Sequence, residues 1–180
     1  MKTCSDIFFF FISLSVALMA GQVSASNLID PIGWYVDAVN GNDANGTGSV
    51  DNPFKSLSAL LAMKERFPGF VRPGDTIYLA EGNYDAEKIA VDIAELRIEG
   101  TLDNQGKPIS VLGKVVVTAD KVTIINCVFL NAGLKLQNVR GVTISNNLFS
   151  GTTENALTLL GASRNIITRN RFESSCFNVV

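Results

Sequence analysis

An internal repeat is the feature that most restricts what this chain can fold into. The copies are Gly113–Phe129, Gly133–Phe149 and Ala156–Phe172. They align without gaps at offsets of 20 and 23 residues, and the alignment places Ile124, Ile144 and Ile167 in one column. A near-constant period of this length is typical of repeat proteins, in which each unit buries its apolar face only by stacking on its neighbours.

Two further apolar columns persist in the same alignment. The columns hold Val116, Leu136 and Leu159, and then Phe129, Phe149 and Phe172. Around them apolar and small polar residues alternate, which indicates strands of about four or five residues. The sequence therefore predicts an all-β fold, a parallel β-helix or solenoid. Its equivalent side chains are expected to lie about 4.8 Å apart in continuous ladders.

An asparagine column follows the second strand of the repeat. Asn147 and Asn170 share this column with Cys127. Asn tolerates the left-handed backbone that a sharp corner needs, and its amide can hydrogen-bond along the stack. We therefore interpret Asn147 and Asn170 as a structural ladder, with a role as ligands as the alternative.

The remaining chain divides into a cap and the coils. In residues 26–72, Ser56 is suited to cap a short helix that runs to about Arg66 and turns Leu57, Leu60 and Leu61 toward the first coil. Residues 73–180 are expected to form the coils, the last of them incomplete. The uncovered final coil predicts end-to-end association with another protein, or else the chain is a shortened product.

Residues 1–25 are predicted to be a signal peptide. Ile7–Ala20 is apolar, and Val23-Ser24-Ala25 offers small residues for cleavage after Ala25. A membrane anchor is the alternative, but a bilayer needs about 20 apolar residues, so we expect a secreted protein, extracellular or periplasmic, with no stable membrane insertion after cleavage. The predicted register keeps Cys127 and Cys176 too far apart for a disulfide, so both thiols are expected to be free.

Composition excludes several classes of chemistry. His is absent, which removes Ser-His-Asp and Cys-His nucleophiles and every His-containing zinc site. The formal net charge of −2 provides no excess of cations for a nucleic-acid backbone, so no nucleic-acid partner is expected.

Cations near the turns form the candidate binding surface. These residues are Lys135, Arg140, Arg164, Arg169 and Arg171. A basic strip on neighbouring coils would suit an acidic polysaccharide. The alternative is an ordinary solvated face.

The loop Asp37–Asn45 is rich in side-chain oxygens. Asp37, Asn42 and Asp43 are the candidate ligands for Ca²⁺, which prefers oxygen donors. The spacing is not that of an EF-hand, and such Asn/Gly/Asp runs are also ordinary turn chemistry. The cofactors are otherwise unknown from the sequence.

The segment Trp34–Leu61, followed by Pro73–Tyr84, resembles a known cap. The matching elements are the strand Trp34–Val36, the turn Asn40–Asp43, the pair Pro53-Phe54 and the strand entry Gly74–Ile77. Together they resemble the N-terminal cap and first coil of secreted right-handed parallel β-helix proteins of the pectate-lyase-like superfamily.

The resemblance implies a right-handed β-helix with a short N-terminal capping helix, and β-elimination on a uronic-acid polymer. In those lyases a Lys or Arg removes the proton, and Ca²⁺ neutralises the substrate carboxylate. No residue of this chain matches their catalytic positions one by one, so the catalytic residues stay unknown. A non-catalytic carbohydrate-binding or structural module, or a lyase fragment, is the alternative.

Overall fold

The computed structural model describes residues 30–84, 88–151 and 155–173, and the backbone of 176–179. Its strands form three sheets. The first sheet has, in spatial order, β1 (Gly33–Val36), β2 (Thr76–Leu79), β5 (Arg97–Gly100), β8 (Thr123–Ile125), β11 (Thr143–Ser145) and β14 (Ile166–Thr168). The second has β3 (Gly82–Tyr84), β6 (Ser110–Leu112), β9 (Cys127–Leu130), β12 (Leu148–Ser150) and β15 (Arg171–Glu173). The third has β4 (Ile89–Val91), β7 (Val115–Val117), β10 (Leu134–Gln137), β13 (Asn155–Leu160) and β16 (Cys176–Val179).

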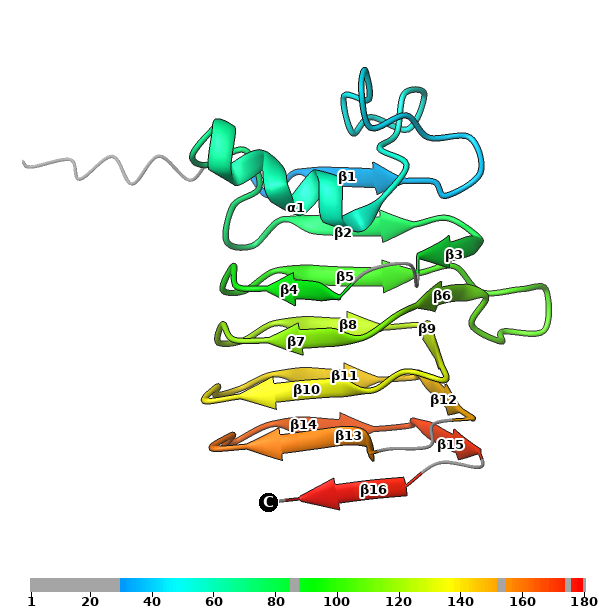
Figure 1. The fold of residues 1–180 in the computed structure, drawn as a ribbon, viewed down its shortest axis with the longest axis vertical. Helices are drawn as coiled ribbons and strands as arrows, with labels where there is room; N and C mark the ends of the chain where they lie inside the picture. The colour runs from blue at the N-terminus through cyan, green and yellow to red at the C-terminus, as the bar shows by residue number, and fades with distance from the viewer. Residues whose placement is uncertain (1–29, 85–87, 152–154, 174–175, 180) are drawn as a thin grey trace, which may run out of the picture.

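From β2 onward, every third strand in the chain belongs to the same sheet. The chain therefore passes through the three sheets in turn, as β2–β3–β4 and then β5–β6–β7, and each such triplet is one coil. All the strand pairs that the structure describes are parallel. The coils stack along one axis, as Figure 1 shows, and the predicted parallel β-helix is confirmed.

Identical side chains stack through the interior. Ile77, Ile98, Ile124 and Ile144 are consecutive partners in the first sheet, and each is fully buried. In the second sheet the Phe149 ring lies 4.7 Å from that of Phe129 and 4.8 Å from that of Phe172, with interplanar angles of 7° and 6°. These spacings equal the distance between neighbouring strands, so the register itself aligns the rings. The predicted Ile and Phe columns are therefore present.

One predicted column is wrong by a residue. Leu136 pairs with Leu159 as expected, but on its other side it pairs with Val117, while Val116 pairs with Lys135. Val117 is buried and Val116 is only half-buried. Leu136 lies 19 residues after its partner Val117, whereas Thr143 lies 20 residues after its partner Thr123, so a gapless alignment cannot hold in both strands. Three successive valines give no alternation that would reveal the shift.

The asparagine ladder is present, but its residues do not adopt the left-handed conformation. Asn147 Oδ1 accepts a hydrogen bond from the Cys127 amide at 2.9 Å, and Asn147 Nδ2 donates to Asn170 Oδ1 at 3.1 Å. The left-handed residues of this corner come one position earlier, and they are Asn126, Asn146 and Arg169, with φ of 59°, 55° and 55°. The residues that turn the chain at this corner are therefore in the column that precedes Asn147 and Asn170.

A helix covers the first coil. Helix α1 (Leu57–Arg66) begins after Ser56, whose side chain accepts from the Ala59 amide at 3.2 Å, and it buries Leu57, Leu60 and Leu61 as predicted. Figure 1 shows α1 lying across the end of the solenoid beside β1 and β2. None of the helices in the described ranges has the length and hydropathy needed to span a bilayer. The predicted signal peptide, residues 1–25, lies outside the described residues.

Cys127 is buried and carries a free thiol. Burial raises the pKa of the Cys127 thiol to about 12. The prediction that this thiol is free is confirmed, whereas the side chain of Cys176 lies outside the described part of the chain.

Candidate functional site

A long loop interrupts one corner of the solenoid. Residues 101–109 separate β5 from β6, whereas the equivalent corner is Asn126 alone between β8 and β9, and two residues between β11 and β12. The loop projects from the side of the solenoid (Figure 1). Insertions in repeat proteins appear as loops on one face, and that face is often the one that binds.

Asp103 organises this loop. Its Oδ1 accepts hydrogen bonds from the backbone amides of Gln105 and Lys107, both at 2.8 Å. The two hydrogen bonds hold the pKa of Asp103 below its ordinary value, and the bond from the Lys107 amide has the larger effect. Leu102 and Pro108 form an antiparallel bridge that closes the base of the turn. The loop therefore has a defined conformation, which places its tip against later coils.

A groove lies between the loop tip and the corners of the later coils. Its cavity volume is about 390 Å³. The loop contributes residues 105–108, and the later coils contribute residues of two corners and of the strands β12 and β15 that follow them: Asn146, Asn147, Leu148, Arg169, Arg171 and Glu173. The size falls within the range of small-ligand sites, about 300–1,000 Å³.

The groove is basic although the chain is acidic. Its lining holds three cations, Lys107, Arg169 and Arg171, against one carboxylate, Glu173. This local excess of two positive charges stands against a net charge of −2 for the whole chain. Arg171 Nε forms an ion pair with Glu173 Oε1, whereas the Arg169 side chain makes no hydrogen bond or ion pair with any described residue. Lys107 and Arg169 therefore carry the charge that the groove offers to an anion.

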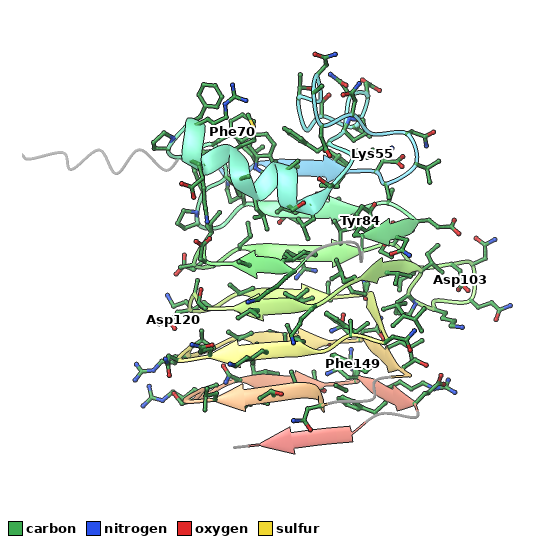
Figure 2. All side chains as sticks on the ribbon, in the orientation of Figure 1. Lys55, Phe70, Tyr84, Asp103, Asp120 and Phe149 are labelled. Carbon is green, nitrogen blue, oxygen red and sulfur yellow. The ribbon has the colours of Figure 1, made fainter. Side chains whose placement is uncertain are left out.

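The structure does not bring the predicted basic residues into one strip. Arg164 precedes β14 and Arg169 follows it, so the two lie at opposite ends of that strand. The Arg140 amide donates to Asp120 Oδ1 at 2.8 Å, and Figure 2 shows Asp120 on the other side of the solenoid from Asp103. Lys135 lies between buried Leu134 and Leu136 on β10, in a different sheet from the groove. Of the five predicted residues, only Arg169 and Arg171 line the groove.

Lys107 and Gln105 line the groove and were missed from the sequence. A signal for them existed, because Asn104-Gln105-Gly106-Lys107-Pro108 is a turn-forming run between two strands. Its length, set against the short corners of the repeats, marks it as an insertion.

The candidate calcium ligands use their oxygens within the protein. Asp37 Oδ1 accepts from the backbone amides of Asn40 and Val39. The Asn40 amide, then the Asn40 side chain and last the Val39 amide hold the pKa of Asp37 below its ordinary value. Asn42 Oδ1 accepts from two backbone amides, those of residues 44 and 45. Asp43 Oδ1 accepts hydrogen bonds from the backbone amides of Lys55 and Ser56. Figure 2 labels Lys55 in the cap region. These contacts close turns, and no group of three or more His, Cys, Asp or Glu suited to a metal occurs in the described ranges.

A second cavity, of about 270 Å³, lies beside the start of α1. Tyr84, labelled in Figure 2, lines it. The Tyr84 hydroxyl donates to a backbone carbonyl, that of Val36 at 3.0 Å or Ala80 at 3.1 Å, and accepts from the Ala38 amide at 3.3 Å. Burial raises the pKa of Tyr84 to about 12. The hydroxyl is thus engaged in tying β1 to the first coil, which is a structural role.

Comparison with known proteins supports the fold and leaves the groove without a precedent. A family model described as a right handed beta helix region matches residues 73–176, a range that begins just before β2 and ends at the first residue of β16. The right-handed coiling in this description agrees with the right-handed β-helix that the resemblance implied. Neither the curated proteins nor the solved structures contain a match to this chain.

Proposed function

The chain belongs to the right-handed β-helix family, and we propose that it is an exported protein that binds an acidic polysaccharide built of uronic-acid units. The binding site in this proposal is the groove beside the loop of residues 101–109. The observation that carries the proposal is the excess of positive charge in this groove on a chain whose net charge is −2.

The groove offers the kinds of groups that a sugar acid requires. A uronic-acid unit carries one carboxylate on a ring with several hydroxyls. Lys107 and Arg169 supply charged donors for the carboxylate. Gln105 and Asn146 line the same groove and supply amides, which both donate to and accept from hydroxyls. Leu148, which is largely buried, adds an apolar residue to the same lining.

The charge distribution favours a short stretch of polysaccharide over a long polyanion. The cations of the opposite corner, such as Arg140 beside Asp120, do not extend the groove. An extended nucleic acid needs many phosphate contacts along one face, which an overall acidic chain opposes. Export is supported by the signal-like segment Ile7–Ala20.

The test is calorimetric titration of the purified protein with a galacturonic-acid trimer, with maltotriose as the neutral control. We expect binding of the acidic trimer alone, weakening as salt is raised, because exposed ion pairs are screened. The double substitution Lys107→Gln with Arg169→Gln removes the two groove cations that no carboxylate in the groove pairs with, and Lys135→Gln with Arg140→Gln removes two cations elsewhere. The first pair should weaken binding strongly and the second should leave it unchanged. Absence of binding by the wild-type protein, or equal loss in both double variants, would contradict the proposal.

The same samples test the lyase alternative that the resemblance implies. Incubation with pectate, alginate and chondroitin, with and without Ca²⁺, is followed by the absorbance of unsaturated ends. A signal that the Lys107/Arg169 double variant lacks would extend the proposal from binding to β-elimination. Binding with no such signal on any of the three polymers would limit the proposal to a carbohydrate-binding module.

A further inference from the structure

Arg169 lies in a column of the solenoid whose other two described members are asparagines. Ser145 pairs with Ile125 and with Thr168, so the residues that follow them, Asn126, Asn146 and Arg169, lie above one another. All three are left-handed, with φ of 59°, 55° and 55°. An L-residue other than Asn or Asp rarely adopts this conformation, because Cβ approaches the following carbonyl oxygen. Arg169 is therefore held in a backbone state that suits its two neighbours better.

The Asn126–Asn146 column is a hydrogen-bonded ladder that ends at Arg169. Asn146 Nδ2 donates to Asn126 Oδ1 at 2.8 Å. An asparagine at position 169 would continue the same pattern by donating to Asn146 Oδ1. In the described part of the chain no donor bonds to that oxygen, and Asn146 lines the groove beside Arg169.

We propose that Arg169 is the specificity-determining residue of the groove, present at the expense of fold stability in order to bind the carboxylate of the sugar acid. This inference rests on the proposed function and adds which residue selects the acidic sugar. The Arg169 side chain is exposed and makes no hydrogen bond or ion pair with a described residue that would offset its left-handed backbone. The same guanidinium lines the groove together with Lys107 and Asn146, and it gives a carboxylate a planar two-donor partner. Strain retained where an alternative residue would relieve it is characteristic of functional sites.

Arg171, the neighbouring cation, is less suited to this role. It pairs with Glu173, and its side chain is 78% exposed. Its charge is therefore already balanced within the groove. Arg169 is left as the groove arginine whose donors are directed at no described residue.

The test compares Arg169→Asn with a matched control, Arg164→Asn. Arg164 is also left-handed, with φ of 56°, but it lies at the other end of β14, outside the residues that line the groove. Both substitutions remove one positive charge and one strained arginine. Only Arg169→Asn extends an existing ladder and removes a cation from the groove.

We expect two opposite effects in Arg169→Asn. Affinity for the galacturonic-acid trimer should fall about tenfold, the scale of one charge-assisted hydrogen bond. The unfolding temperature should rise by about 2–4 °C through the relieved backbone and the added amide bond. Arg164→Asn should bind the trimer as the wild type does and should gain less thermal stability. Arg169→Lys should recover part of the affinity, because it restores the charge without the planar fork.

The outcomes separate this inference from the proposed function. If the wild type binds the trimer and Arg169→Asn binds it equally well, the inference is overturned while the proposed function stands. If Arg169→Asn loses affinity but also loses thermal stability, the trade-off is refuted and Arg169 is a structural residue. If the wild type does not bind the acidic trimer, both the proposed function and the inference about Arg169 are refuted. Should Arg169→Asn fail to fold by circular dichroism, the claim of relieved strain is refuted directly, and Arg169→Gln measures the loss of the guanidinium.

Discussion

Truncation of Phe149 measures how much the stacked interior contributes to stability. This ring is fully buried and lies between the rings of Phe129 and Phe172 at 4.7 and 4.8 Å. Phe149→Ala removes the transfer free energy of the ring and leaves a cavity, a loss of about 3–5 kcal/mol. Two stacked contacts add about 0.5–1.5 kcal/mol each. We therefore expect the free energy of unfolding to fall by about 4–8 kcal/mol.

The assay is urea-induced unfolding followed by far-ultraviolet circular dichroism, with thermal unfolding in parallel. A loss of this size corresponds to a fall in the unfolding temperature of about 10 °C or more for a chain of this length. Phe172→Ala is the matched control in the same column. Because its ring is 36% exposed, it should cost about half as much. The reasoning is refuted if Phe149→Ala loses less than about 1.5 kcal/mol, or no more than Phe172→Ala.

Three further substitutions probe the ladder, the loop and the thiol. Asn147→Ala leaves the Cys127 amide and the Ile124 carbonyl without their partner, so urea unfolding should show a loss of about 3 kcal/mol, against about 1 kcal/mol for the less buried Asn146→Ala. Asp103 has a folded pKa below its ordinary 3.8, so its stabilising effect is present above that value and is lost as pH falls through the folded pKa. The stability difference between wild type and Asp103→Asn, measured by thermal unfolding, should therefore exist at pH 7 and close below about pH 4; a constant difference would contradict it. Because burial raises the pKa of Cys127 to about 12, the Cys127 thiol of the folded protein should not react with a thiol reagent. Folded Cys127→Ala and the folded wild type should therefore consume the same number of equivalents, whereas unfolded Cys127→Ala should consume one fewer than the unfolded wild type.

The stacked columns could be predicted because they repeat. Ile124, Ile144 and Ile167 each meet a copy of themselves one coil away, so an alignment of the sequence with itself is already an alignment in space. The capping helix was equally predictable, since Ser56 and three leucines specify its start and its buried face locally. The prediction was wrong where the repeat length changes inside a coil, as at Val116 and Val117.

The binding groove could be predicted only in part. Arg169 and Arg171 were among the candidates, but they were grouped with Arg164, which is closer to Arg169 in the sequence than Lys107 is. Strand β14 separates Arg164 from Arg169, whereas the loop of residues 101–109 brings Lys107 into the same groove. Distance along the chain was therefore a poor guide to which cations meet.

The sequence alone determined that this chain winds into stacked coils, that isoleucine and phenylalanine fill the interior, and that asparagine lines one corner. Each of these features depends on contacts between equivalent residues that are one repeat apart, and such a repeat can be found in the sequence alone. Only the tertiary structure decided which charges share a groove and which residue bends each corner. Those outcomes depend on a loop that has no counterpart in the other coils and on turn lengths that vary by a single residue. No periodicity encodes them, so they become apparent only when the coils are stacked.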